Sequence, residues 1–425
     1  MPKILAKKTK KNLETITPKN LHRLDFFDLA IDRLFGVVVD TAINESVTAI
    51  HFEFQKNGGN IRFRHQGKLR IVYAFDRVRF LELLNYVVNY FDFESQHKLP
   101  QLSRLVYQQD GRQYYLNASW IKLSQTESRL VININHNLDK KITDLPVNNF
   151  TKAVLDKYLK KNLAATIVTC KQVEKRKDYL FSLALSNLSE NEKAVSIEYY
   201  VSKNVTKIEQ LQIRPEIGFT CDTALRAVMA QDFDVIIIDE LKTTAELDFA
   251  LHLALAGKKV FIGMIFDGLN DVFRFVRHQN IDLDLWFLVV GGVLVVREIE
   301  KVCQKCRQVI NIDSQAKDLI QPEINNLPVK AKIVFAKLIS SEWHFVEGVG
   351  CVSCQNSGLT GLTDLVEFAQ INKKFKNGLI NKTGQYRLID LIDDTTLVSL
   401  RQDALIKALS GELAFNNILK LDRYI

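Results

Sequence analysis

The sequence predicts an α/β protein in which an N-terminal α+β unit precedes a unit built on a mostly parallel sheet. Period-two strand patterns dominate residues 47–134, strands alternate with helices from 150 to 265, and one short apolar strand ends in the acidic pair Asp239 and Glu240. Alternating strands and helices form parallel sheets that helices cover on both faces, and ligands bind at the carboxyl ends of the strands. We therefore expect any functional site of the second unit at those strand ends.

The composition is that of a globular protein with more than one domain. The 425 residues are 47% hydrophobic, which is enough for two or three buried cores. Part of the net charge of +8 lies in a basic leader, residues 1–24, which we expect to be a flexible arm; contact with an acidic surface is the alternative. The leader lacks the apolar core of a signal peptide, and the apolar run 285–296 is too short to cross a bilayer. We expect a soluble protein that can dock on a membrane complex.

The first unit is expected to span residues 25–140. Helical and strand periodicities predict a helix at 26–39, strands at 47–54, 61–64 and 68–72, a helix at 79–91, and strands at 104–108, 113–120 and 128–134. The glycine pair within 57–60 predicts a hairpin turn. A polar stretch with Pro146 marks the end of the unit.

The second unit is expected at 141–298. The predicted elements are a helix at 150–160, a strand at 164–169, a helix at 178–188, a strand at 194–200, a helix at 222–231, a strand at 235–238, a helix at 245–256 and a strand at 259–265. A helical tail at 299–425 is expected to carry two cysteine pairs.

Asp239 and Glu240 follow the apolar strand 235–238 directly. Two carboxylates in this place are typical of a Walker B element, where one orders a magnesium ion and the other polarises the attacking water. A strand capped by solvated acids is the alternative, since such strand ends are common in α/β folds. These residues alone leave both interpretations open.

A phosphate-binding loop would follow the strand 164–169. Such a loop needs glycines, because successive backbone N–H groups must curl around the phosphates while a lysine reaches in. The chain has TCKQVEKRKD at 169–178 and no glycine between Gly111 and Gly218. Its cations are candidate phosphate contacts, namely Lys175, Arg176 and Lys177. The bulky side chains cannot readily form the N–H cradle, so we expect ATP and magnesium to bind weakly or not at all.

Four cysteines form two CxxC pairs, Cys303 with Cys306 and Cys351 with Cys354. Two such pairs can place four thiolates tetrahedrally around one zinc ion, and the 44 residues at 307–350 between them can fold outwards. No histidine or open coordination position is implied, which predicts a structural site. Unligated or redox-active thiols are the alternative.

The order of motifs from about residue 25 to the end resembles the motor ATPases of secretion and pilus assembly, namely the E protein of type II secretion and the extension motor of type IV pili. Residues 47–53 (VTAIHFE) and 61–69 (IRFRHQGKL) are similar to two motifs of the family's N-terminal domain. Residues 208–234 share a long pattern with the family, and 350–361 (GCVSCQNSGLTG) resembles its GCxxCxxTGYxG motif.

The chain departs from this family in the motifs that carry its chemistry. The Walker A motif TGPTGSGKTT corresponds to 169–178, where all three glycines and the Lys-Thr pair are lost. Glu198 is what remains of the Asp box, and Phe266 replaces the histidine of the His box. Glu240 occupies the position of the catalytic Walker B glutamate.

Some charged positions of the family are kept. Arg62 and Arg64 remain as candidates for contacts with the site of a neighbouring subunit, and Arg297 and Glu367 fall on a family arginine and glutamate. Losing several parts of one reaction centre together predicts hydrolysis near the background rate, since each part typically contributes orders of magnitude.

The resemblance implies a PAS-like domain at 25–140, a RecA-like P-loop NTPase-type domain at 141–298 with a degenerate nucleotide site, and a helical, zinc-bearing region at 299–425. It also implies a cytoplasmic homo- or hetero-hexamer, peripheral at the inner membrane, at the base of a type IV pilus or type II secretion machine. There it would contact the inner-membrane platform protein and, in a mixed ring, an active motor paralogue. Our leading hypothesis is a pseudo-ATPase that acts through assembly.

Two alternatives remain. The first is a weakly active motor that uses Glu240 with Lys175 or Arg176 as an improvised phosphate clamp. The second is a nucleic-acid-binding protein that acts through its basic leader, residues 1–12. Nothing in the predicted domains suggests base readout, so we do not expect nucleic acid as a partner. Structural zinc is the expected cofactor.

Overall fold

The computed structural model describes residues 29–55, 58–65, 68–94, 99–123, 127–136, 139–161, 164–279, 281–340, 342–371 and 396–421. The chain divides into two compact units, one of Met1–Asn137 with Ser202–Asn204 and one of Leu138–Val201 with Val205–Ile425. The predicted leader lies outside the described residues. Among the helices described, none is long and apolar enough to cross a membrane.

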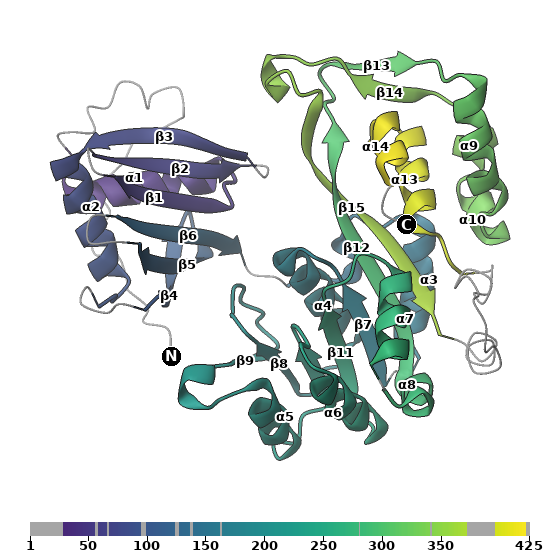
Figure 1. Ribbon diagram of the computed structural model, residues 1–425, viewed down its shortest axis with the longest axis horizontal. Coiled ribbons are helices and arrows are strands. Elements are labelled where there is room, and N and C mark those ends of the chain that lie inside the picture. The colour runs from purple at the N-terminus through teal and green to yellow at the C-terminus, as the bar shows by residue number, and fades with distance from the viewer. Residues whose placement is uncertain are drawn as a thin grey trace. The chain divides into compact units, whose positions relative to one another are not determined.

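The first unit is a six-stranded antiparallel sheet in the order β3-β2-β1-β6-β5-β4, with two helices on one face (Figure 1). Its elements are α1 (Ile31–Asn44), β1 (Ala49–Gln55), β2 (Gly58–His65), β3 (Lys68–Asp76), α2 (Arg77–Tyr90), β4 (Gln101–Gln109), β5 (Arg112–Lys122) and β6 (Ser128–His136). Alternate strand residues, such as Ile50 and Phe52, pack with helix residues such as Leu34 and Phe80 in one core. This alternation is the signal that predicted the strands.

All six strands and both helices predicted for this unit are present, but the first helix was placed wrongly. It was expected at 26–39 and lies at Ile31–Asn44, where Ala42 and Ile43 extend its buried face. Asp40 lies inside this helix. In the fold, its carboxylate accepts a hydrogen bond of 2.7 Å from the Tyr107 hydroxyl, so the helix continues through it.

The second unit is built on a seven-stranded sheet in the order β15-β12-β7-β11-β10-β8-β9. Its strands and the helices between them are α3 (Asn149–Leu159), β7 (Ala165–Thr169), α4 (Val173–Asn187), β8 (Ala194–Glu198), β9 (Glu209–Gln212), α5 (Cys221–Met229), β10 (Val235–Ile238), α6 (Thr244–Leu255), β11 (Lys259–Met264), α7 (Leu269–His278), α8 (Leu283–Val289), β12 (Val290–Val302) and β15 (Leu359–Gln370). Strands β12, β7, β11, β10, β8 and β9 are parallel, as the alternating pattern predicted, and β15 is antiparallel to β12.

Both faces of this sheet are buried. Ile236 and Ile238 of β10 pack into the core shared with α5 and α6, whereas Val235 and Ile237 pack into the core shared with α3 and α4. A strand buried on both faces has no polar alternation, which is why the run VIII is continuously apolar.

The region after β11 is not the helical tail that the sequence predicted. Figure 1 shows β12 and β15 as a long antiparallel pair that runs from the sheet to the small pair β13 and β14. The remaining elements are β13 (Arg307–Ile310), α9 (Ser314–Asn325), α10 (Val329–Val334), α11 (Ala336–Ser340), β14 (Phe345–Gly348), α13 (Leu400–Leu409) and α14 (Phe415–Leu421). The apolar run 285–296 covers the end of α8 and the start of β12. Because the run is continuously apolar, its pattern did not indicate where the helix ends and the strand begins.

Candidate functional site

The carboxyl ends of four parallel strands meet at one edge of the seven-stranded sheet. In the strand register, Ile238 lies between Ile197 of β8 and Ile262 of β11, and Met264 lies beside Thr169 of β7. The side chains that follow these positions therefore share one edge, as expected for the ligand site of such a sheet. This is where the sequence placed the nucleotide site.

The segment after β7 is shorter than predicted. Helix α4 begins at Val173, not at 178, so only residues 170–172 separate it from β7. Without glycines, the chain turns directly into the helix. The Thr169 hydroxyl, at the strand end, donates to the Phe266 carbonyl at 2.9 Å and accepts from its N–H at 2.7 Å. The predicted phosphate contacts Lys175, Arg176 and Lys177 thus all lie on the first turns of α4.

Arg176 is fully buried and is held by the end of β10. Its Nη2 lies 2.7 Å from Glu240 Oε2 and 3.5 Å from Asp239 Oδ1. Its Nε donates to the Asp239 carbonyl at 2.9 Å, and its Nη1 donates to the Cys170 carbonyl at 3.1 Å. The guanidinium therefore pairs with both carboxylates of the predicted Walker B element.

Lys177, also buried, pairs with Glu198, the residue predicted to be what remains of the Asp box. Its Nζ lies 2.9 Å from Glu198 Oε2, donates to the Tyr200 carbonyl, and lies 3.5 Å from Asp239 Oδ2. The other oxygen of Glu198 accepts hydrogen bonds of 2.7 Å from both Ser196 and Gln210. Burial alone would lower the pKa of Lys177, but Glu198 and Asp239 outweigh it and raise the pKa, so the amine stays charged.

The other cations of the segment are paired as well. Lys175 lies 3.0 Å from the buried Asp364 and 3.2 Å from Glu298, and these two carboxylates raise its pKa against the opposing effect of burial. Lys171 pairs with Asp267. Sequence reasoning missed Asp364 and Glu298; the only available signal was an aspartate inside the apolar run of β15.

The group around Asp239 carries two cations and three carboxylates, namely Arg176 and Lys177 with Glu198, Asp239 and Glu240. Burial raises the pKa of Asp239 to about 6, although Lys177 and Arg176 favour its charged form. Removing either cation would leave a buried negative charge with less compensation. The cations in this group thus compensate the charge of the carboxylates, and the carboxylates compensate the charge of the cations.

Gly263 allows β11 to approach the end of β10. A Cβ at this position would lie 1.8 Å from the Asp239 carbonyl oxygen, which is the atom that accepts from Arg176. The Leu241 N–H donates to the Gly263 carbonyl at 3.1 Å, so the backbone after β10 is fixed on both sides. A side chain at Gly263 would displace the carbonyl that holds the guanidinium.

A magnesium nucleotide needs free carboxylate oxygens for the ion and free cations and N–H groups for the phosphates. Here each cation of residues 171–177 is paired with a carboxylate of the same unit, and the acids that would serve the ion are paired with Arg176 and Lys177. The residues present therefore do not fit this group, and we derive no hydrolytic step from them.

Arg62 and Arg64, the predicted contacts with a neighbouring subunit, lie on one face of β2 in the first unit and are half-buried. Arg62 pairs with Glu53 of β1 at 3.4 Å. Burial, followed by the charge of Arg64, lowers the pKa of His51 on the adjacent strand. Their role towards another subunit stays a prediction.

The four cysteines of the two CxxC pairs come together between β12, β13, β14 and β15. Their Sγ atoms all lie within 4.8 Å of one another, with 3.9 Å between Cys303 and Cys351, 3.8 Å between Cys306 and Cys354, and 3.7 Å between Cys351 and Cys354. Four thiolates at about 2.3 Å from a tetrahedral zinc ion lie about 3.8 Å apart. The spacing fits such an ion, and all four are free of disulfides.

Backbone groups fix this tetracysteine cluster. The N–H groups of Cys351 and Gly358 donate to Cys354 Sγ at 3.1 and 3.3 Å. Gly358 has a φ of +73°, and a Cβ there would lie 2.3 Å from the Gly348 carbonyl oxygen. Within the described ranges, no other group of three or more His, Cys, Asp or Glu side chains is placed to hold a metal ion.

A family model described as "Type II/IV secretion system protein" matches residues 28–420. The type II secretion system protein E of Aeromonas hydrophila is 22% identical over 401 residues, which cover 93% of this chain and 76% of that protein. The type IV pilus assembly ATPase PilB of Thermus thermophilus is also 22% identical, over 93% of this chain and 43% of its own length.

Solved structures share the fold. The ATPase DotB of Legionella pneumophila superposes with a TM-score of 0.64 at 9% identity, over 92% of this chain and 96% of its own. The pilus retraction motor PilT with bound ADP gives a TM-score of 0.58 at 13% identity, over 90% and 95%. The α/β architecture with its mixed sheet is therefore one that DotB and PilT also have.

Proposed function

The chain belongs to the family of type II/IV secretion system proteins, and we propose that it is a catalytically degenerate member, a pseudo-ATPase that serves as a structural or regulatory subunit of a motor ring. The observation that carries this proposal is the burial of Arg176 against Asp239 and Glu240. A guanidinium cannot be deprotonated in proteins, so this charge persists at every physiological pH. It neutralises the two acids that would otherwise order an ion and polarise water.

The domain assignments, the assembly and the cellular location that we propose rest on this family. Its members include proteins named for type II secretion and type IV pilus assembly. We assign the first unit as a PAS-like domain, the central sheet as a RecA-like domain and the tetracysteine cluster as a structural zinc site. The subunit would join a homo- or hetero-hexamer at the cytoplasmic face of the inner membrane, with an active paralogue in a mixed ring and the platform protein as its membrane partner.

A subunit with a fixed site can bias its neighbours without turnover. In a cycling ring, each active subunit passes between conformations as ATP binds and leaves, whereas a subunit that does not bind ATP favours one conformation throughout. Its contacts then shift the conformational equilibrium of adjacent subunits, which is regulation by differential binding. Arg62 and Arg64 are our candidates for such contacts.

The weakly active motor remains the alternative within the same family. It would need Lys175 or Arg176 to release its carboxylates and hold a phosphate. Taking Arg176 from Asp239 and Glu240 would leave Glu240 unpaired and the buried Asp239 with Lys177 as its one remaining cation, which costs several kcal/mol. Nucleotide binding would have to supply that energy, so this alternative predicts weak affinity. Nucleic-acid binding would depend on residues 1–12, outside the described part of the chain.

Calorimetric titration of the full-length protein with MgATP tests the proposal. We expect no binding at sub-millimolar concentrations for the wild type. Submillimolar, magnesium-dependent binding that Glu240→Gln abolishes would support the weakly active motor instead. Arg226→Ala is the matched control, because Arg226 forms an exposed pair with Asp222 on α5 and its loss should leave the titration unchanged.

A further inference from the structure

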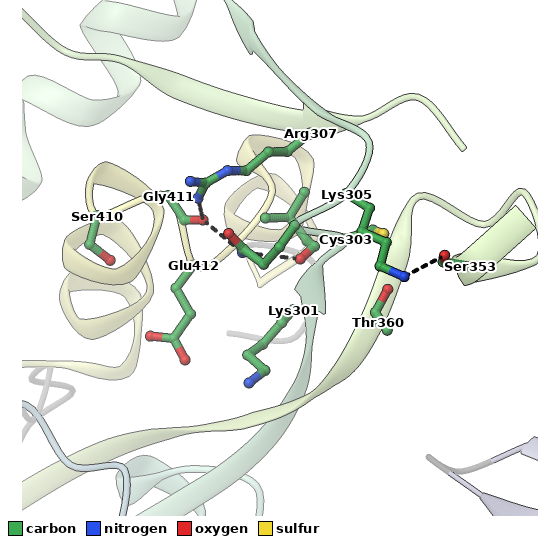
Figure 2. A pocket seen from close by; sticks show the side chains of 11 residues that line it. Lys301, Cys303, Lys305, Arg307, Ser353, Thr360, Ser410, Gly411 and Glu412 are labelled. Carbon is green, nitrogen blue, oxygen red and sulfur yellow. Dashed lines mark hydrogen bonds between the residues drawn. The ribbon is translucent and has the colours of Figure 1, made fainter. Parts of the chain in front are cut away.

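A basic cavity lies beside the tetracysteine cluster, away from the nucleotide site. It has a volume of about 600 Å³ and is bordered by the end of β12, the start of β13 and the turn after α13. Figure 2 shows Lys301, Lys305 and Arg307 around it, with Glu412 on the side of α13. None of the residues described at the candidate nucleotide site lines this cavity.

The lysines of the cavity have no carboxylate partner among the residues that the structure describes. Lys305 Nζ donates to the neutral Ser353 hydroxyl at 3.0 Å, and Arg307 Nη1 donates to the Gly411 carbonyl at 3.0 Å. No carboxylate within the described residues forms an ion pair with Lys301 or Lys305. The pattern contrasts with residues 171–177, where each cation has a carboxylate partner. Such unneutralised cations favour an anionic ligand.

The same cavity also offers acceptors. The Glu412 carboxylate lines it, and Thr360 Oγ1 is buried there without a hydrogen-bond partner. A fully anionic ligand such as inorganic phosphate would be repelled by Glu412. A ligand that carries carboxylates together with N–H donors satisfies both sets of groups, and an acidic peptide is such a ligand.

Exposed apolar side chains lie in the segment that leads to Ser353, which lines the cavity. Val352, between two of the cysteines, is 93% exposed, and Val349 is 62% exposed and hydrogen-bonded through its N–H to the Cys306 carbonyl. Val349 lies two residues before Cys351 and Val352 directly follows it, so the backbone of the tetracysteine cluster holds both valines in place. Exposed valines next to free lysines suit a segment in which apolar residues alternate with acidic ones.

We infer that this cavity is a docking site for an acidic, partly apolar segment of a partner protein. Carboxylates of that segment pair with Lys301 and Lys305, its backbone N–H groups donate to Glu412 and Thr360, and its apolar side chains cover Val349 and Val352. The tetracysteine cluster is then the rigid base of a protein-binding surface. This role does not depend on whether the nucleotide site is active.

Fluorescence anisotropy with a fluorescein-labelled peptide of glutamate and leucine residues tests the inference on the full-length protein. We expect salt-sensitive binding, weakened about tenfold or more in the double variant Lys301→Glu, Lys305→Glu, because two charge-assisted contacts become repulsive. Lys317→Glu and Lys330→Glu, on exposed positions of α9 and α10, form the matched control and should bind like the wild type. Metal content, measured for each variant, shows that the cluster is intact.

Three outcomes would overturn the inference. The first is no peptide binding by metal-loaded wild type, and the second is an equal loss in the control variant. The third is competition by inorganic pyrophosphate as strong as that of unlabelled peptide, which would indicate a simple anion site. Sedimentation with phosphatidylglycerol vesicles that the double variant abolishes, in the absence of peptide binding, would assign the cavity to a membrane surface instead.

Discussion

The guanidinium of Arg176 lies 2.7 Å from the Glu240 carboxylate and has no exposed surface. The first turn of α4 thereby supplies a cation to the acidic end of β10. In a working nucleotide site, a metal ion and a bound nucleotide would provide the charges that these acids face. Here the chain itself provides the positive charge permanently. The pair joins the glycine-free start of α4 to the acids at the end of β10.

Arg176→Ala should destabilise the fold by about 3–5 kcal/mol, since it leaves the partly buried Glu240 without its cation and the buried Asp239 with Lys177 alone, at 3.5 Å. Arg226→Ala, which removes a solvent-screened, exposed pair with Asp222, should cost much less stability. Urea unfolding of both variants measures the difference. Equal losses in the two variants would mean that the buried pair contributes no more than a surface pair.

Lys177 and Glu198 should show strong coupling. Lys177→Met leaves Glu198 as an unpaired buried charge, and Glu198→Gln leaves Lys177 facing an amide, so each single change is costly. The double variant removes both charges and should be more stable than the sum of the single losses predicts, by about 1–3 kcal/mol. A double-mutant cycle in urea measures this coupling. Additive losses would show that the two side chains contribute independently.

Much of the fold was predictable because burial leaves simple periodic signals. Period-two alternation located every strand of the first unit, and the continuous run VIII located β10 with both its ends correct. The strand β15 was missed because two carboxylates, Asp364 and Glu367, interrupt the apolar pattern of its buried half. It lies at the edge of the sheet, antiparallel to β12. These carboxylates have partners far away in the sequence, and no local pattern reveals them.

The candidate site was predictable in position but not in its contacts. The order of strand ends placed Glu198, Asp239 and Glu240 together, and the absence of glycines predicted a poor phosphate cradle. That Arg176 and Lys177 pair with those acids could not be derived, because it depends on where the first turn of α4 points its side chains. The four cysteines were the exception, since their CxxC spacing predicted directly that the four thiols lie together.

The tetracysteine cluster should bind one zinc ion per chain. Cys303→Ser or Cys354→Ser should lower the zinc content well below one ion per chain and unfold the β13–β14 region, because metal binding and folding are coupled. Cys170→Ser, at a buried cysteine outside the cluster, should retain the metal. Elemental analysis after metal-replete purification measures this. Less than about half an ion per wild-type chain would argue against a zinc site.

The buried carboxyl group of Glu367 should make the stability of the fold depend on pH. Burial raises its pKa to about 7 from a usual 4.5, against the effects of the Leu400 backbone and Arg297. A folded pKa above the unfolded one means that the stabilising effect of protonation is full below about pH 4.5 and is lost as the pH rises through about 7. Glu367→Gln keeps a neutral side chain of similar shape at every pH. The variant should therefore gain stability relative to the wild type between about pH 5 and about pH 8, by up to about 3 kcal/mol, since each pKa unit corresponds to about 1.4 kcal/mol.

Urea unfolding across this range measures the gap, and the comparison near pH 5, where the folded wild type is protonated, is the internal control. A gap that stays constant with pH would show that the Glu367 carboxylate keeps an ordinary affinity for its proton in the folded protein.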